Sequence, residues 1–251
     1  MLPTDKLLLS RARIVPGYYA LIPPEGRVYN TFPHIQGKVA ITATPKLGAG
    51  FVSYVIRPDQ SKRIVGKLIS DKDIEYFLYI NNGMVNITTE KIKGTMEKGF
   101  YMYLPPNQYA DFESWDESGE IFLYKRKYVP LEGKFPWFVW GNASNIPWHD
   151  CEDAQNLLSK ELLPSNEEFD IGFHILRFKK GGCHGFVETH YQEHGAFILQ
   201  GQGMYLLDTI WSPVKKGDFI WMGPFVPQAA YGIGEGEFSY LLSKDCNRDF
   251  I

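Results

Sequence analysis

The sequence predicts an all-β protein in which two similar β-domains follow one another along the chain. Two observations carry this prediction: short strand-like runs separated by turn residues, and an internal repeat. The chain has 251 residues, of which 44% are hydrophobic and 15% aromatic, and it contains 24 glycines and 16 prolines. This composition is typical of a compact, turn-rich fold and excludes a disordered chain.

Short runs rich in β-branched and aromatic residues alternate with Gly, Pro or Asn, which is typical of a β-sandwich or β-barrel. The clearest runs lie at 50–57, 75–89, 99–107, 120–129, 171–178, 196–208 and 217–225. One segment, 151–163, has acidic residues first and apolar residues at helical spacing, and we expect it to form a short helix. It lies within a polar stretch, 141–168, that we expect to link the two domains.

The internal repeat relates the two halves of the chain at a nearly constant offset. "EYFLYINNG" (75–83) aligns with "EHGAFILQG" (193–201), and at the same offset of 118 residues Gly99 aligns with Gly217. Farther upstream, "GFVSYVIR" aligns with "GFHILRF" at an offset of 122, so the loop between these segments differs in length. A fold used twice explains this pattern. We therefore expect an N-terminal domain over 1–140 and a C-terminal domain over 141–251.

The two halves differ in chemistry, because side chains that can bind a metal occur in only one of them. The second half has Glu188, His190, His194 and Gln228. Their counterparts at the offset of 118 are Ser70, Lys72, Tyr76 and Ala110. None of these four is a typical metal ligand. We expect a degenerate N-terminal domain without a metal site.

Glu188, His190 and His194 lie in "VETHYQEHGAF" (187–197), which has two possible interpretations. On a helix the two histidines are one turn apart on one face, as in zinc proteases. On extended chain all three residues face one side, and a turn after His190 is needed to bring them to one ion. The flanking glycines favour strands. The extended interpretation directs Glu193 away from the ion.

Two imidazoles, a carboxylate and an amide form a mixed nitrogen and oxygen donor set. Such a set suits Mn(II), Fe(II), Ni(II) or Zn(II), and its oxygen atoms favour Mn or Fe. The alternative is that these residues are ordinary polar surface groups. Their concentration inside an apolar β-pattern favours a metal site.

Charge and composition exclude several other classes of function. The net charge of −3 is spread over well-mixed signs, and "KRK" (125–127) is too short for a nucleic-acid surface. The sequence shows neither a signal peptide nor the roughly 20 apolar residues that cross a bilayer. Three distant cysteines, Cys151, Cys183 and Cys246, do not suggest a disulfide framework. We expect a cytoplasmic protein that binds neither nucleic acid nor membrane.

At this point the C-terminal half resembles the cupin family. Gly182, five residues, Glu188 and His190, three residues, His194, six residues and Gly201 follow the first cupin motif, with Glu and His exchanged at its ends. Gly217 opens the second motif, and Gln228 occupies the place of its usual histidine. The resemblance implies two tandem jelly-roll β-barrels.

The exchanged ligands, together with "TPKLGAGFVSY", "FLYKRKYVP", "VKKGDFIWMG" and "YLLSKDCNRD", are similar to the (S)-ureidoglycine aminohydrolase family of bicupins. This resemblance spans nearly the whole chain. It implies Mn(II) bound by Glu188, His190, His194 and Gln228. It also implies that Tyr205, Tyr240 and Lys244 contact the substrate, together with Glu188 and Gln228.

The resemblance implies hydrolysis of (S)-ureidoglycine to (S)-ureidoglycolate and ammonia, a step of purine (allantoin) catabolism. Lys244 would bind the substrate carboxylate or transfer a proton, and Glu188 would be the general base. At the offset of 118, Lys244 aligns with Arg126 and Tyr240 with Phe122, so a cation at this strand end also has a purely structural interpretation. The alternative functions are a ureide-binding bicupin without catalysis, or another metal-cupin reaction such as isomerisation or dioxygenation. The aromatic-rich strands indicate a homo-oligomer.

Overall fold

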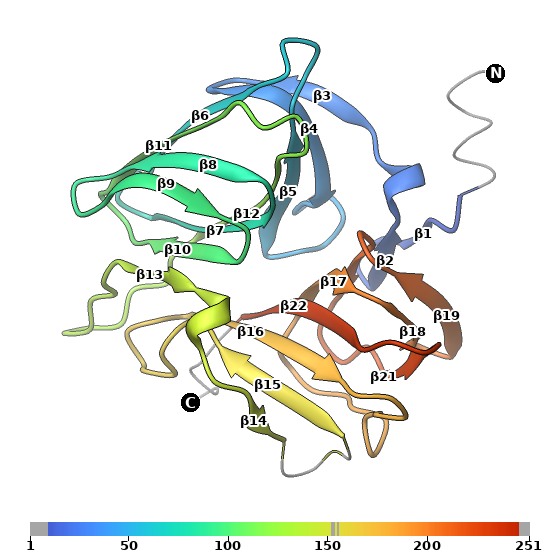
Figure 1. The fold of residues 1–251 in the computed structure, drawn as a ribbon. Coiled ribbons are helices and arrows are strands. Elements are labelled where there is room, and N and C mark those ends of the chain that lie inside the picture. Colours follow the sequence, from blue (N-terminus) through green and yellow to red (C-terminus); the bar gives the residue numbers. More distant parts are fainter. Residues whose placement is uncertain (1–9, 152–153, 155, 246–251) are drawn as a thin grey trace. The chain divides into compact units, whose positions relative to one another are not determined.

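The computed structural model describes residues 10–151, 154 and 156–245, and these form an almost entirely β structure (Figure 1). This confirms the predicted all-β class. No helix among these residues is long and apolar enough to cross a membrane. Cys151 and Cys183 are free thiols, and Cys246 lies outside the described residues.

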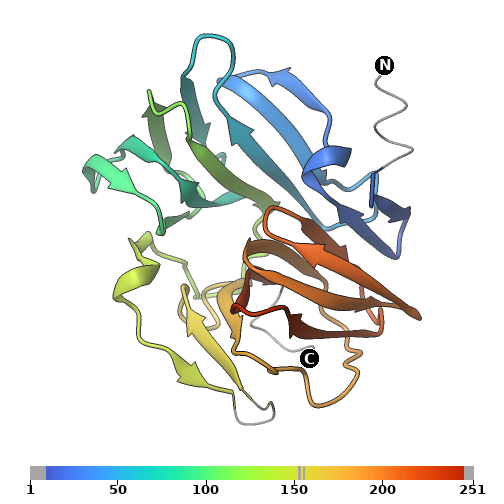
Figure 2. The ribbon, with the colours of Figure 1, turned by 45° about the vertical axis from the view of Figure 1, so that its right-hand side comes forward.

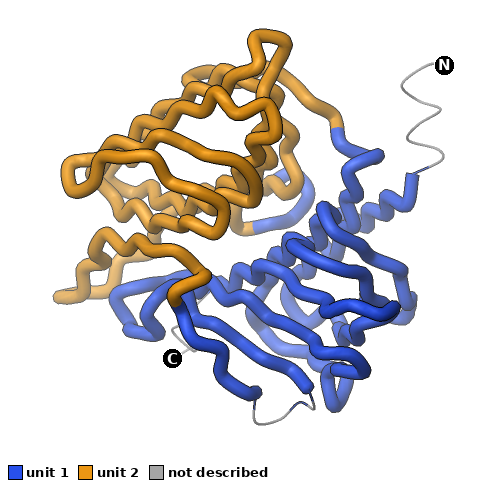
Figure 3. Tube along the Cα trace, in the orientation of Figure 1, with its two compact units in different colours: residues 1–27, 46–49, 146–251 blue, residues 28–45, 50–145 orange. Residues whose placement is uncertain are grey.

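The chain divides into two compact units (Figure 3). We call residues 28–45 and 50–145 the N-terminal barrel, and residues 1–27, 46–49 and 146–251 the C-terminal barrel. Compared with the division expected at residue 140, the beginning of the chain belongs to the C-terminal barrel. The reason is strand pairing, because Tyr19–Ile22 pairs antiparallel with Phe219–Met222.

The C-terminal barrel contains two sheets (Figures 1 and 2). One has the strand order β1-β2-β20-β17-β22-β16-β15-β14 and the other β19-β18-β21. Side chains of both sheets pack into one core that includes Ile198, Tyr205 and Tyr240. The elements are β1 (Arg13–Val15), β2 (Tyr19–Ile22), the 3-10 turn η1 (Pro24–Gly26), β14 (His149–Asp150), β15 (Leu157–Glu161), β16 (Ile171–Phe178), β17 (His194–Gln200), β18 (Gln202–Leu207), β19 (Ile210–Lys215), β20 (Phe219–Met222), β21 (Gln228–Ile233) and β22 (Phe238–Asp245).

The N-terminal barrel is one curled sheet of order β13-β10-β7-β12-β5-β4-β6-β11-β8-β9, with β3 beside β4. Its core includes Leu78, Phe112 and Leu123. The elements are β3 (Tyr29–Phe32), β4 (Ile35–Ala43), β5 (Phe51–Arg57), β6 (Ile64–Ile69), β7 (Ile74–Asn82), β8 (Met84–Thr88), β9 (Lys93–Glu97), β10 (Phe100–Leu104), β11 (Tyr109–Ser114), β12 (Glu120–Lys127), β13 (Val139–Asn142) and the 3-10 turn η2 (Ala143–Asn145).

The structure confirms the internal repeat at its glycines. Gly99 and Gly217 have φ angles of 91° and 90°, in the left-handed region that favours glycine. Their backbone N–H groups donate to Ile80 O at 2.9 Å and to Ile198 O at 2.8 Å, which are themselves related by the offset of 118. The same turn therefore precedes β10 and β20.

The strand pairing changes the offset between equivalent residues at both ends of the repeat. His194 pairs with Lys244, whereas Tyr76 pairs with Lys125, so the counterpart of Lys244 is Lys125 and not Arg126. The offset is 119 along β12 and β22, because the loop before β22 is one residue longer. By the same ladders the counterpart of Tyr240 is Ile121 and not Phe122. The upstream offset of β5 to β16 is 120, since Lys125 pairs with Val52 and Lys244 with Gly172.

The helix predicted over 151–163 is replaced in its described part by strand β15. Leu157 is buried and pairs with Phe178, and Lys160 pairs with Ile175 of β16. Pairing to an existing sheet edge outweighs a weak helical pattern of apolar residues. The only helical element in the described part of the linker is the 3-10 turn η2. Residues 152, 153 and 155 lie outside the described part.

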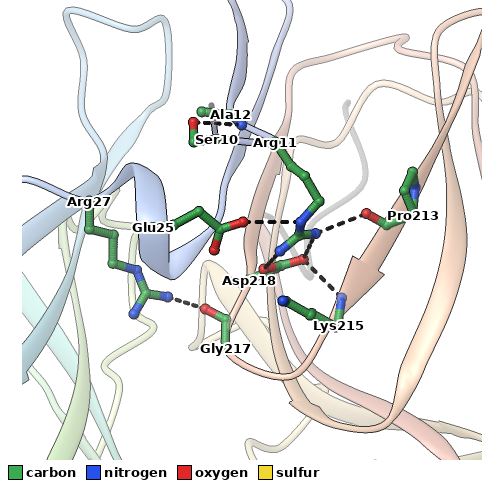
Figure 4. Close-up of polar contacts among 9 residues, drawn as sticks. All are labelled: Ser10, Arg11, Ala12, Glu25, Arg27, Pro213, Lys215, Gly217 and Asp218. Carbon is green, nitrogen blue, oxygen red and sulfur yellow. Dashed lines mark hydrogen bonds and ion pairs between the residues drawn. The ribbon is translucent and has the colours of Figure 1, made fainter. Parts of the chain in front are cut away.

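An ion pair between Arg11 and the buried Asp218 joins the start of the described chain to the turn before β20 (Figure 4). Arg11 Nη1 and Nη2 donate to the two carboxylate oxygens of Asp218 at 2.6 and 2.8 Å, and Nη1 also donates to Pro213 O at 3.0 Å. The Asp218 side chain is 0% exposed, and its Oδ2 accepts a further hydrogen bond from Lys215 N at 2.8 Å. Such bidentate pairs fix geometry as well as charge.

Replacing Arg11 with methionine is expected to lower the free energy of unfolding by about 2–3 kcal/mol, because it leaves the buried Asp218 carboxylate without its cation. The measurement is chemical denaturation of both proteins. Glu25→Gln is the matched control, since Glu25 pairs with the same guanidinium at 3.1 Å but is 39% exposed. Equal losses in the two variants would contradict the importance of the buried pair.

Candidate active site

The site lies in a cavity of about 270 Å³ inside the C-terminal barrel. Its wall is formed by side chains of β15, β16, β17, β18, β21 and β22 and by residues preceding β17. Five of the predicted site residues line it: Glu188, His194, Tyr205, Gln228 and Tyr240. Glu188 and His194 of the 187–197 segment therefore line the same cavity as Tyr205 of β18 and Gln228 of β21.

Glu188 and Gln228 are brought together by their backbones. They form an isolated antiparallel bridge, in which each N–H donates to the carbonyl of the other at 2.8 Å. Phe225 N donates to His190 O at 2.7 Å and Thr189 Oγ1 donates to Phe225 O at 2.9 Å, which hold the turn before β17. The segment is extended, turned and extended again. This confirms the extended interpretation and excludes the helical one.

Three nitrogen atoms converge on one point beside the cavity. His190 Nε2 lies 3.0 Å from His194 Nε2 and 3.1 Å from Gln228 Nε2. His194 Nδ1 lies 3.3 Å from Ser243 O, so its N–H can donate to this carbonyl and leave the Nε2 lone pair free. Rotating the Gln228 amide by about 180° points its oxygen at the histidines. In that orientation two imidazole nitrogens and an amide oxygen face one another.

The donor geometry fits one small cation. Two atoms bonded at right angles to an ion at about 2.1 Å lie about 3 Å apart, which matches the separation of the two Nε2 atoms. No group of three His, Cys, Asp or Glu side chains gathers at metal-binding distance within the described residues. The Glu188 carboxylate thus lines the cavity rather than touching the histidine pair.

Both histidines are held in the neutral form that a metal requires. Burial lowers the pKa of His194 to about 3, and His190 adds to this effect. Burial, followed by the charge of Lys244, also lowers the pKa of His190. Burial raises the pKa of Glu188, whereas Lys244 opposes this shift. A buried carboxylate whose proton affinity is raised is suited to accepting a proton.

Lys244 is positioned by the ladder of β22. Its neighbours across the sheet are His194 on β17 and Gly172 on β16. Its positive charge acts to lower the pKa of Glu188, His190 and His194. Lys244 therefore brings a positive charge to the edge of the predicted ligand set.

Tyr205 and Tyr240 are both 1% exposed, and their rings meet edge to face at 5.9 Å. Tyr205 Oη lies 3.5 Å from the Gln228 amide, on the side away from His190; after the amide rotation it would accept a hydrogen bond from the amide nitrogen. Burial raises the pKa of both phenols, so each remains a hydrogen-bond donor at neutral pH. They add two hydroxyl groups to a wall that also contains Glu188, His194 and Gln228.

Other residues of the cavity wall had weak or no signals in the sequence. His184 lines the cavity, stacks on Phe178 at 5.3 Å, and has its pKa lowered to about 4 by burial. The position of Cys151 in the wall has no motif that reveals it. Glu193 is directed to Trp221, whose Nε1 donates to Glu193 Oε2 at 2.9 Å, and it is only 5% exposed. Glu193 is thus a packing residue.

The corresponding place in the N-terminal barrel has no comparable donors. Tyr76 and Ala110 occupy the positions of His194 and Gln228, as predicted. Ala110 pairs with Leu68, so the counterpart of Glu188 is Leu68 and not Ser70. Asn107 N donates to Ser70 O as Phe225 N does to His190 O, so Ser70 and not Lys72 corresponds to His190. A loop two residues shorter in the second half, between His190 and His194, explains both shifts.

Comparison with known proteins places this chain in a family. No family model matches it. It is 44% identical over 248 residues to the (S)-ureidoglycine aminohydrolase of Escherichia coli, covering 98% of this chain and 95% of that protein. The chain belongs to the (S)-ureidoglycine aminohydrolase family. This is a family of hydrolases that act on a carbon–nitrogen bond. The (S)-ureidoglycine aminohydrolase of Arabidopsis thaliana is 33% identical over 92% of this chain and 76% of its own length.

Solved structures share this fold. Protein Ylba from E. coli aligns with a TM-score of 0.85 and 42% identity over 98% of both chains. A putative glyoxylate-induced protein from Pseudomonas aeruginosa aligns at 0.84 with 26% identity, over 96% of this chain and 94% of its own. Oxalate decarboxylase from Bacillus subtilis aligns at 0.66 with 10% identity, over 94% of this chain and 79% of its own, which supports the bicupin fold alone.

Proposed function

We propose that this protein hydrolyses (S)-ureidoglycine to (S)-ureidoglycolate and ammonia in the cavity of the C-terminal barrel. The observation that carries the proposal is the convergence of His190, His194 and Gln228 beside Lys244 in a member of the aminohydrolase family. This set combines a place for a cation with a fixed positive charge. A substrate with a carboxylate, an amine and a ureido group matches both.

The metal that we propose is Mn(II), held by His190, His194, the Gln228 amide oxygen and Glu188. Two imidazoles with oxygen donors and no thiolate suit this ion. Glu188 would complete this set, because its backbone is bridged to that of Gln228. Bound there, the ion would supply Lewis acidity towards the substrate and towards water.

The remaining side chains divide the work of binding and proton transfer. Lys244 binds the substrate carboxylate, and the phenols of Tyr205 and Tyr240 donate to the ureido oxygen. Glu188 accepts a proton from water as the water oxygen bonds to the substrate carbon. The bond from that carbon to the amine nitrogen breaks, and the nitrogen leaves as ammonia with the transferred proton.

The test is to incubate purified, Mn(II)-loaded protein with freshly generated (S)-ureidoglycine and follow ammonia above the uncatalysed rate. Chiral chromatography of the product is expected to show the (S)-ureidoglycolate enantiomer in excess. Ammonia release at the background rate, or a racemic product, would contradict the proposal. Consumption of dissolved oxygen would instead indicate a dioxygenase.

The oligomeric state and the compartment belong to this proposal as well. Large apolar side chains are exposed on the N-terminal barrel, among them Phe135 at 78% and Trp140 at 52%. Such groups favour burial against further subunits, and we propose a cytoplasmic homo-oligomer. Light scattering of the purified chain measures the mass, and a monomer at micromolar concentration would contradict this part.

A further inference from the structure

The N-terminal barrel has a cavity of its own, of about 420 Å³, at the place that the repeat assigns to the active site. Tyr76 and Lys125 line it as a ladder pair, in the positions of His194 and Lys244. Leu68 lines it in the position of Glu188. The barrel thus keeps the cavity and the lysine, but the positions of Glu188, His194 and Gln228 carry no metal-binding donors.

Lys125 is the charged group of this cavity that lies deepest in the sheet. Its Nζ stands over the ring of Tyr76, 5.6 Å from the centroid. Among the residues that the structure describes, no carboxylate lies within ion-pair distance of this ammonium group. Lys127, two residues further along the same strand face, is exposed, whereas Lys125 is half-buried. Lys125 therefore directs a cation without an anionic partner into a recess.

The other lining groups favour an organic anion over an inorganic one. Burial raises the pKa of Tyr54, and it raises that of Tyr76 to about 12, so both phenols are neutral donors at physiological pH. Leu68 and Leu123 are 2% and 1% exposed and form an apolar floor. Lys67 adds positive charge to the lining, against the single described lining carboxylate, Asp71.

We propose that the N-terminal barrel binds a small organic carboxylate through Lys125, at a site separate from the catalytic cavity. The carboxylate accepts hydrogen bonds from the Lys125 ammonium group and from the Tyr54 phenol, whereas the Tyr76 O–H donates to Ile69 O at 3.4 Å. The apolar part of the ligand lies against Leu68 and Leu123. This site is equivalent, within the repeat, to the catalytic cavity of the C-terminal barrel.

The test uses a matched pair of probes that differ only in charge, ureidoacetate and its neutral amide, ureidoacetamide. Isothermal titration of full-length, Mn(II)-loaded protein with ureidoacetate is expected to show two sites per chain. Lys125→Met is expected to weaken one of them at least about tenfold. Lys125→Arg and the exposed control Lys127→Met keep both sites. Ureidoacetamide is expected to leave the Lys125 site empty.

Melting temperatures of the variants are measured in parallel, because a misfolded barrel would also lose a site. If Lys125→Met does not fold, binding of ureidoacetate is compared with binding of ureidoacetamide in the wild-type and Lys125→Arg proteins. The proposal then requires that only ureidoacetate occupies the Lys125 site. A wild type in which no ureidoacetate site is weakened by Lys125→Met would overturn the proposal. So would two unchanged sites in folded Lys125→Met, or equal binding of the neutral amide.

Discussion

Replacing His190 with alanine is expected to abolish stoichiometric Mn(II) binding and to reduce ammonia release at least about a hundredfold. Loss of a group that only supports a ligand already costs 10–100-fold in metal affinity, so losing a ligand itself costs more. His190 is the better choice for the experiment, since it is half-buried, whereas His194 is only 5% exposed and its loss would leave a cavity in the core.

The measurements for His190→Ala are metal content after gel filtration and initial rates of ammonia release with added Mn(II). His149→Ala is the matched control, because His149 is exposed on β14 and is expected to leave metal and rate unchanged. If His190→Ala kept one tightly bound Mn(II) per chain, the ligand assignment would be wrong. If it lost Mn(II) but kept its rate, the ion would be structural.

Replacing Lys244 with methionine is expected to lower kcat/KM by about 10²–10³ while Mn(II) binding is retained or strengthened. Lys244 pairs with His194 across the sheet, and its charge acts to lower the pKa of both histidines and of Glu188, so it opposes a second positive charge there. Removing it relieves repulsion of the ion but removes the partner of the substrate carboxylate. A loss of this size is typical for one preorganised charge that stabilises a transition state.

Lys244→Arg separates the two roles of this lysine. As a carboxylate anchor, arginine preserves part of kcat/KM, whereas a proton-transfer role is lost because guanidinium does not titrate near neutral pH. Lys216→Met, on an exposed turn, is the control for charge in general. Parallel losses of metal and activity in Lys244→Met would contradict the separation of anchor and ligand.

The repeat and its glycines were readable from the sequence because they are local. Gly99 and Gly217 mark turns with positive φ, and the turn residues set the strands that follow. The grouping of His190, His194 and Gln228 followed once those strands were counted. These are short-range consequences of strand alternation and turn chemistry.

Pairing between strands and side chains that are distant in the sequence could not be predicted from the sequence. The segment with Leu157 has a helical pattern, and only its partner strand β16 makes it β15. Because the loop before β22 is one residue longer, Lys125 and not Arg126 is the residue equivalent to Lys244 in the repeat. The pairing of Arg11 with Asp218 joins residues 207 positions apart, for which the sequence offers no signal. Register and salt bridges of this kind depend on tertiary contacts.

The central claim is that one cation beside His190 and His194 makes this barrel a hydrolase. The most direct measurement is a titration of metal-free protein with Mn(II), following the rate of ammonia release from (S)-ureidoglycine at each addition. The account predicts background release without metal and a linear rise that ends at one Mn(II) per chain. Full activity in metal-free protein, or a rise that continues to two ions per chain, would contradict it.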